Sequence, residues 1–119
     1  MDTSTTLYDL KCLIQSFCED RDWDQYHNPK ELAIGISTEA GELLDKFRFL
    51  SDKQIAELLA SDKRVSVEHE LADVFFFLLR FAQRYEIDLD DALRAKLEIN
   101  QEKYPIDKAR GNNLKSTEY

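Results

Sequence analysis

The stretch HELADVFFFLL, residues 69 to 79, decides the fold class because it places two acids within an almost continuous apolar run. Apolar side chains on nearly every side predict a helix that other elements cover all round. We expect this helix to begin after Ser66 as its cap, to run to about Tyr85, and to lie at the centre of a bundle or at a subunit interface. Glu70 and Asp73 are the residues that this packing does not explain.

Two more helices are predicted on the amino-terminal side of this stretch. Residues 6–19 and residues 28–49 repeat apolar side chains every three or four positions, which is the period of an amphipathic helix. Thr6 and Asn28 are suited to cap them. Residues 19–27 lack a period and predict a loop.

The remaining segments complete the predicted architecture. Residues 51–61 repeat the helical pattern weakly and predict a short extra helix, while residues 88–103 predict a fourth long helix capped by Asp88. Residues 106–119 are polar and predict an irregular tail. We therefore expect an all-α fold with a four-helix-bundle-like core, in one domain that spans residues 1–119.

Composition supports a single soluble helical domain. The chain has 119 residues, of which 43% are hydrophobic and 34% charged, with only 3 Gly and 2 Pro for turns. No apolar run approaches the roughly 20 residues that a membrane span requires. The amino terminus lacks the features of a secretory signal, so we expect a cytoplasmic protein in which Cys12 and Cys18 are reduced.

The net charge limits the partners. A formal charge of −8 argues against a nucleic acid or an anionic membrane as the main partner, because neither gains from an acidic surface. A small molecule rich in phosphate can still bind if a divalent cation lies between the two sets of negative charge.

Four acids lie where the helical pattern expects apolar residues. Positions three apart on a helix differ by about 60°, so Glu39 and Glu42 share one face, as do Glu70 and Asp73. Glu39 lies at the edge of an apolar stripe, and Glu70 points with core residues. The neighbours that define these stripes are Leu32, Ile36 and Leu43 for Glu39, and Val74, Phe77 and Phe81 for Glu70.

A single Glu-x-x-Glu pair is compatible with an ordinary solvated face, but two pairs on core-facing stripes favour a shared site. Each close contact between carboxylates costs about 4 kcal/mol at an effective dielectric constant of about 20, and desolvation adds to this cost. A cation must compensate. Oxygen ligands without Cys or a well-placed His favour Mg²⁺ or Mn²⁺ over zinc. A di-iron site would need Glu-x-x-His, whereas Ser66 stands three residues before His69.

With these acids the sequence resembles the all-α nucleoside triphosphate pyrophosphohydrolases, the MazG-like and dCTP pyrophosphatase group. Their signature is Glu-x-x-Glu, a spacer and Glu-x-x-Asp, which Glu39, Glu42, Glu70 and Asp73 match. The resemblance covers most of the chain. It extends over RDWDQYHNP (21–29), EAGELLDKF (39–47), HELADVFFFLL (69–79) and the region 96–110.

The resemblance implies a reaction. The four acids would bind Mg²⁺, with Mn²⁺ as a substitute, and Glu39 or Glu42 would also orient or deprotonate the attacking water. Water would attack the α-phosphorus of a nucleoside triphosphate, dCTP or a related or modified deoxynucleotide first, and release the monophosphate and pyrophosphate. The alternative is a helical interaction module that has kept the fold without catalysis; the complete set of acids argues against it.

The resemblance also implies substrate contacts. Lys96 and Asn100 would contact phosphate and sugar, Tyr104 would line the pocket, and Trp23 and Phe49 would stack on the base. The plainer interpretation is ordinary helix surface for Lys96, Asn100 and Tyr104, and a core anchor for Trp23.

Two departures from the group leave the base preference open. Phe49 stands where close dCTP pyrophosphatases have Trp, and Phe77 where they have Tyr.

The resemblance also implies an assembly. Relatives assemble as dimers or dimers of dimers, and three consecutive Phe rings are compatible with a subunit interface, so we expect a homo-oligomer, in particular a tetramer.

Overall fold

The structure is a computed structural model that describes all 119 residues, and it contains six α-helices and no strand. The all-α class is therefore confirmed. The chain divides into two compact units, Met1–Glu86 and Ile87–Tyr119. The single domain expected from chain length stays a prediction. None of the helices is both long enough and apolar enough to cross a membrane.

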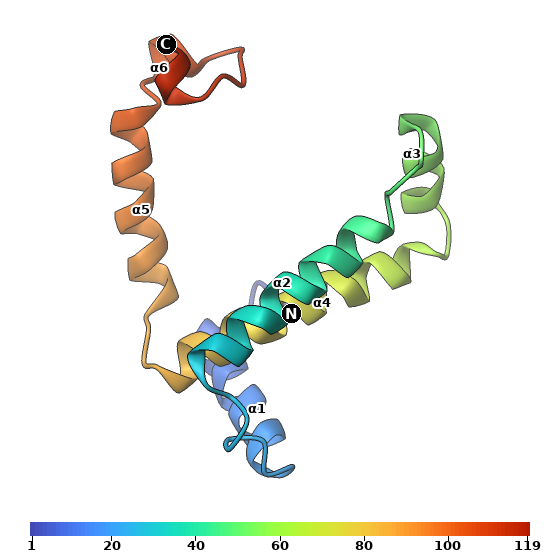
Figure 1. The fold of residues 1–119 in the computed structure, drawn as a ribbon, viewed down its shortest axis with the longest axis vertical. Coiled ribbons are helices and arrows are strands. Elements are labelled where there is room, and N and C mark those ends of the chain that lie inside the picture. The colour runs from blue at the N-terminus through green and yellow to red at the C-terminus, as the bar shows by residue number, and fades with distance from the viewer. The chain divides into compact units, whose positions relative to one another are not determined.

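Unit 1 holds four helices and unit 2 the remaining elements (Figure 1). In unit 1 these are α1 (Leu7–Glu19), α2 (Pro29–Asp45), α3 (Asp52–Ala60) and α4 (Arg64–Arg84); in unit 2 they are α5 (Leu89–Lys103), α6 (Ile106–Ala109) and a 3-10 turn (Ser116–Glu118). The fourth helix expected in the core, α5, thus belongs to the second unit, and the four-helix-bundle-like core stays a prediction.

Helix α4 organises unit 1. It packs against α1, α2 and α3, and it runs side by side with α2 (Figure 1). The fully buried residues come from α1, α2 and α4, and are Cys18, Leu32, Leu79, Arg80 and Ala82. One of the five is an arginine, so the small core contains a charge.

Local sequence explains where most helices begin. The side chains of Thr6, Asn28 and Asp88 each accept a hydrogen bond from a backbone N–H three residues on, as predicted. The short helix expected over residues 51–61 is present as α3, where Ser51 forms a capping box with Gln54.

Two helix boundaries were predicted wrongly. Helix α4 begins at Arg64 without a side-chain cap, and Ser66 is already inside it, where its hydroxyl donates to the carbonyl of Lys63 at 2.8 Å. Helix α2 ends at Asp45 rather than near Phe49. Phe49 has φ of +65°, a left-handed backbone that cannot continue a right-handed helix.

The tail was also predicted wrongly in part. Residues 106–119 contain α6 and the 3-10 turn instead of being irregular throughout. Pro105 precedes α6 with extended ψ and supplies the carbonyl that starts it, accepting from Lys108 and Ala109. The backbone N–H of Lys115 donates to the Glu118 carboxylate at 2.6 Å, which closes the turn. Short local hydrogen bonds of this kind leave little trace in apolar periodicity.

A glycine sets the spacing between α2 and α4. The ring of Phe77 lies so close to Gly35 that a Cβ atom there would meet ring carbons at 2.6 Å. Gly35 is one turn before Glu39 and Phe77 one turn after Asp73, so this close approach lies beside the acids.

One face of α4 is uncovered in the single chain. Leu71, Phe75 and Leu78 are 58%, 41% and 42% exposed. They line a hollow of about 670 Å³ together with Asp2 and other α4 residues. In unit 2, helix α5 is mostly exposed and has no buried residue. The expectation that other elements cover α4 all round is therefore not met within one chain.

Candidate metal centre

Two pairs of acids face each other across the contact between α2 and α4. Glu39 belongs to α2, while Glu70 and Asp73 belong to α4. Because α2 and α4 run side by side, ligand oxygens of these three residues all lie within 4.8 Å of one another. We call Glu39, Glu70 and Asp73 the carboxylate cluster.

The carboxylate cluster contains buried oxygens without partners. Glu39 and Glu70 are half-buried, and the Oε2 atom of each is inaccessible to solvent and makes no hydrogen bond. A buried acceptor without a partner costs about 1 to 3 kcal/mol, and more when it is charged. Two such atoms side by side on facing helices are therefore unfavourable unless a cation binds them.

The electrostatics of Glu39 point the same way. Its pKa is raised, first by burial, then by a hydrogen bond with Glu42, and further by the negative charges of Glu42, Asp73 and Glu70. These are the consequences of confining several carboxylates without positive charge. A divalent cation would oppose this shift, because its charge favours the ionised carboxylates.

Glu42 differs from the other three acids. It is exposed, as Asp73 is, but its ligand oxygens are not among those that lie within 4.8 Å of one another. Its contact is with Glu39, one turn away on α2. The structure thus brings three of the four predicted ligands together and places Glu42 beside them; metal binding by Glu42 stays a prediction.

The donor set indicates the kind of ion. Three carboxylates with no Cys or His in the group suit a hard cation such as Mg²⁺ or Mn²⁺. The residues therefore fit the ion that the sequence predicts.

A second group of acids lies at the start of α5 but has other partners. Asp88, Asp90 and Asp91 are all exposed. Asp88 caps the helix by accepting from the backbone of Asp91 at 2.9 Å, and Asp90 pairs with Arg94 at 2.9 Å. These carboxylates have partners or bulk water, so they do not require an ion.

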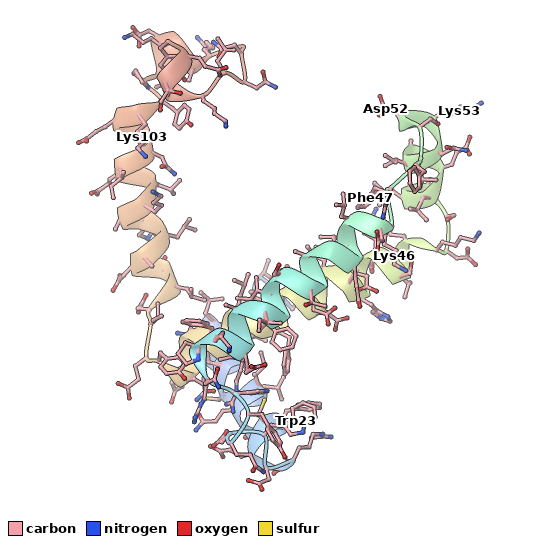
Figure 2. All side chains as sticks on the ribbon, in the orientation of Figure 1. Trp23, Lys46, Phe47, Asp52, Lys53 and Lys103 are labelled. Carbon is pink, nitrogen blue, oxygen red and sulfur yellow. The ribbon has the colours of Figure 1, made fainter.

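The two aromatic residues predicted to stack on a base lie in unit 1. Trp23 is half-buried in the loop after α1 (Figure 2), and its ring centroid lies 5.7 Å from that of Phe17 and 5.9 Å from that of His27. Phe49 is 89% exposed, and the guanidinium carbon of Arg48 lies 4.7 Å from its ring centroid. Trp23 thus packs against two neighbouring rings, whereas the ring contact of Phe49 is with the side chain of the residue before it.

The other predicted substrate residues belong to unit 2. Lys96 is exposed on α5, Asn100 is half-buried, and the Tyr104 ring packs edge-on against Tyr119 with centroids 6.1 Å apart. Their roles stay predictions.

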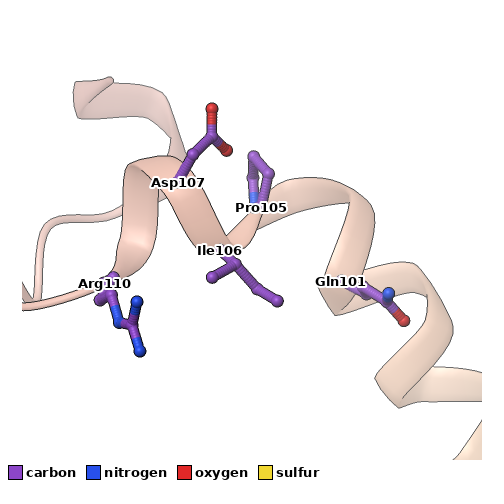
Figure 3. Close-up of a pocket in the computed structure, with 5 residues that line it drawn as sticks. All are labelled: Gln101, Pro105, Ile106, Asp107 and Arg110. Carbon is purple, nitrogen blue, oxygen red and sulfur yellow. The ribbon is translucent and has the colours of Figure 1, made fainter.

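Unit 2 also has a shallow hollow of about 570 Å³ with one cationic side chain. Figure 3 shows the residues that line it, which are Gln101, Pro105, Ile106, Asp107 and Arg110. It contains no cluster of reactive groups.

The sequence analysis missed one set of polar residues. Arg80 is fully buried on α4, with Asp24, His27 and Gln83 as partners of its guanidinium. The test that singled out the acids would have found it, because Arg80 stands between Leu79 and Ala82 in the apolar part of the helix.

Several known proteins are similar to this chain in sequence and in fold. The sequence profile of the MazG-like family matches residues 34–118. The chain is 35% identical over 114 residues to "dCTP pyrophosphatase 1" of Homo sapiens and 33% identical to the Mus musculus protein, covering 95% of this chain and 67% of each relative. The crystal structure of a pyrophosphatase from Archaeoglobus fulgidus superimposes with a TM-score of 0.77 at 38% identity, over 83% of this chain and 92% of that one.

Proposed function

The chain belongs to the MazG-like family of nucleotide pyrophosphohydrolases, and we propose that it hydrolyses a deoxynucleoside triphosphate to the monophosphate and pyrophosphate with the help of Mg²⁺. Mn²⁺ is expected to substitute. dCTP is the first candidate substrate, because the relatives in human and mouse are dCTP pyrophosphatases. Related or modified deoxynucleotides follow.

One observation carries this proposal. The Oε2 atoms of Glu39 and Glu70 are buried and unpartnered, and both residues belong to a cluster with Asp73. A triphosphate brings more negative charge to the same place, so substrate and cluster are compatible only with a cation between them. When bound there, Mg²⁺ lowers the pKa of coordinated water and balances charge on the phosphate oxygens.

The protein side of the reaction is assigned to Glu39 and Glu42. Glu42 is exposed next to Glu39, so its carboxylate is accessible to a water molecule. We propose that Glu42 orients this water through a hydrogen bond. Its carboxylate then accepts the proton of the water as the water attacks the α-phosphorus. The bond from the α-phosphorus to the bridging oxygen then breaks and pyrophosphate leaves. Glu39 completes the metal site.

Aromatic side chains are proposed to hold the base. The half-buried Trp23 offers one ring in a fixed orientation, and the exposed Phe49 offers another. Base stacking on an aromatic ring contributes about 1 to 3 kcal/mol and tolerates different bases. Phe49 and Phe77 lack the polar groups that Trp and Tyr would supply, so we expect weaker discrimination between bases than such groups would give.

Unit 2 is proposed to supply the remaining contacts. Lys96 would contact phosphate, Asn100 the sugar, and Tyr104 would line the pocket. All three lie on or directly after α5, where they recur at helical spacing.

A homo-oligomer, in particular a dimer of dimers, is part of the proposal. The exposed Leu71, Phe75 and Leu78 form an apolar stripe on α4 that a second copy would cover. The cytoplasm remains the proposed location, and no nucleic acid or membrane partner is proposed. Sedimentation at micromolar concentration tests the assembly: a monomer would contradict it.

The reaction is tested with purified protein, Mg²⁺ and a panel of nucleoside triphosphates. We expect release of monophosphate and pyrophosphate, with no orthophosphate, and loss of turnover in Glu39→Gln and Asp73→Asn. The matched control is Glu68→Gln, since Glu68 is an exposed acid on the same helix that pairs with Arg64. Turnover of no nucleotide would favour the alternative, a helical interaction module without catalysis.

A further inference from the structure

The arginine that the sequence analysis missed connects α4 to the loop of residues 20–28. Arg80 is fully buried, yet each guanidinium nitrogen has a partner. Nε donates to His27 Nδ1 at 2.8 Å, Nη1 donates to Gln83 Oε1 at 2.6 Å, and Nη2 pairs with the Asp24 carboxylate. Two of the three acceptors belong to the loop, so this side chain attaches the loop to α4 at two points.

Other side chains of α4 and its cap reinforce the attachment. Arg84 Nη1 lies 3.6 Å from Asp24 Oδ2, and its Nη2 donates to the Asp24 carbonyl at 3.4 Å. The Tyr85 hydroxyl donates to the His27 carbonyl, also at 3.4 Å. The loop needs such support, because Asp22 holds φ of +56°, which a residue other than glycine adopts only at an energetic cost.

The same contacts fix the state of the imidazole. Because the Nε–H of Arg80 donates to Nδ1 of His27, that nitrogen carries no proton, and the neutral ring holds its proton on Nε2. Burial, followed by the positive charges of Arg80 and Arg84, lowers the pKa of His27, and the negative charge of Asp24 opposes them. Its ring therefore stays neutral and in one orientation.

The fixed ring lies against the tryptophan of the loop. The centroids of Trp23 and His27 are 5.9 Å apart, and Phe17 contacts Trp23 edge-on from α1. Figure 2 shows Trp23 at the loop that follows α1. Asp24 and His27 thus flank a residue whose own side chain makes only ring contacts, so Trp23 takes its orientation from its neighbours.

We propose that Arg80 is a positioning residue for nucleotide binding, which through Asp24 and His27 holds Trp23 in the orientation that receives the base. This inference rests on the proposed function, in which Trp23 stacks on the base. Stability alone does not explain the choice of residue, because apolar side chains of similar volume often replace buried ion pairs without loss of stability. What the planar guanidinium adds is direction, since its donors reach three acceptors at once.

Steady-state kinetics of Arg80→Met give the first test. We expect the KM for the best nucleotide to rise about tenfold with kcat changed by no more than about twofold, because uniform binding is lost while the reacting groups stay in place. Arg80→Lys keeps the positive charge but loses the planar set of donors, so its KM should lie between those of the wild type and Arg80→Met. Arg64→Met, which removes an exposed arginine from the same helix, should leave both constants unchanged.

A second substitution separates positioning from a purely structural role. In a Trp23→Ala background, Arg80→Met should add nothing further to KM, because the residue through which Arg80 acts is gone. Independent, multiplicative effects of the two substitutions would overturn the inference. If Arg80→Met fails to fold, Asp24→Asn takes its place, since Asp24 is 41% exposed and its loss leaves two of the three Arg80 contacts.

Fluorescence makes the outcome independent of turnover. Trp23 is the only tryptophan, so its emission reports on the loop alone. We expect nucleotide with Mg²⁺ to quench it, and Arg80→Met to weaken this binding about tenfold. Wild-type protein that binds in this way but releases no pyrophosphate would remove the proposed reaction and keep the role of Arg80. Turnover by the wild type with equal KM and equal quenching in Arg80→Met would remove the role of Arg80 and keep the reaction.

Discussion

Helix α4 carries two polar clusters that differ in one respect. Toward its end, every guanidinium nitrogen of Arg80 has an acceptor in Asp24, His27 or Gln83. Near its middle, Glu70 faces Glu39 and each has a buried oxygen with no partner. Both clusters interrupt an apolar helix, so sequence pattern alone does not separate them. Arg84 Nε, beside the Arg80 cluster, is also buried without a partner, but the Arg84 guanidinium pairs with the opposite charge of Asp24. Opposite charges in contact indicate a group that holds the fold in place, whereas unsatisfied like charges indicate a group that awaits a ligand.

The largest expected effect breaks the unsatisfied cluster. Asp73→Asn and Glu39→Gln should each lower kcat/KM about 10²- to 10³-fold, since several kcal/mol of transition-state stabilisation depend on the bound cation. The same changes should not destabilise the metal-free protein, because each removes repulsion among carboxylates. Kinetics and thermal melts without Mg²⁺ measure the two quantities. A large loss of metal-free stability would mean that these acids hold the fold together.

The satisfied cluster should respond in the opposite way. Arg80→Met leaves Asp24, His27 and Gln83 without their donor and should lower the free energy of unfolding by about 2 kcal/mol, less than the roughly 3 to 5 kcal/mol of a fully buried pair because Asp24 is 41% exposed. Urea denaturation measures the change. Arg64→Met, which breaks an exposed pair, should cost less than about 1 kcal/mol.

A substitution at Gly35 should disturb the carboxylate cluster without affecting the Arg80 cluster. The added Cβ of Gly35→Ala would meet the Phe77 ring at 2.6 Å, so the ring or the two helices must shift, at a cost of about 1 to 2 kcal/mol. Turnover should fall. Because ring contacts connect Phe77 through Phe76 and Phe17 to Trp23, a shift of the Phe77 ring should also change Trp23 fluorescence.

Gly41→Ala is the matched control on the same helix. A Cβ there meets nothing within 4 Å, so this substitution should stabilise α2 by about 0.5 kcal/mol. Equal losses of turnover in Gly35→Ala and Gly41→Ala would contradict the account of the helix spacing.

The smallest expected effect is a difference in pH response. The pKa of Asp24 is lowered, first by its hydrogen bond with Arg80, and that of His27 is lowered by burial and by the charges of Arg80 and Arg84. The unfolded chain therefore takes up protons first as pH falls below the ordinary values of 6.5 for His27 and 3.8 for Asp24, and the fold loses stability through that window.

Glu39 has the opposite sign. Its pKa is raised above 4.5, so the folded chain binds the proton more tightly, and the metal-free fold loses stability as pH rises from 4.5 through the raised value. Melts of the metal-free protein over this range should show a steeper acid loss in wild type than in His27→Gln, and a smaller loss at rising pH in Glu39→Gln. Identical profiles in all three proteins would contradict both assignments.

Much of unit 1 could be predicted from sequence because its signals are local or periodic. Thr6 and Asn28 mark helix starts by residue type, and three-residue spacing places Glu70 and Asp73 on one face whatever surrounds them. The family assignment was likewise available from the acids and their flanks.

What sequence could not supply depends on contacts between elements. The close approach of Gly35 and Phe77 joins two helices, and two of the three partners of Arg80, His27 and Asp24, lie more than 50 positions away in the chain. Helix α2 ends at Asp45, where Lys46 and Phe47 donate to carbonyls three residues back, and no side chain there predicts this end or the left-handed backbone of Phe49. Spacing also could not separate the exposed Glu42 from the three acids that converge.

The central claim is that Glu39, Glu70 and Asp73 form a site for a divalent cation, and thermal melts with and without millimolar Mg²⁺ test it most directly. Ligand that binds only the folded chain stabilises it by about 2.7 kcal/mol at a concentration of 100 times Kd. We predict that Mg²⁺ raises the Tm of the wild type and of Glu68→Gln, and leaves that of Asp73→Asn unchanged. An equal rise in all three proteins, or no rise in the wild type, would contradict the claim.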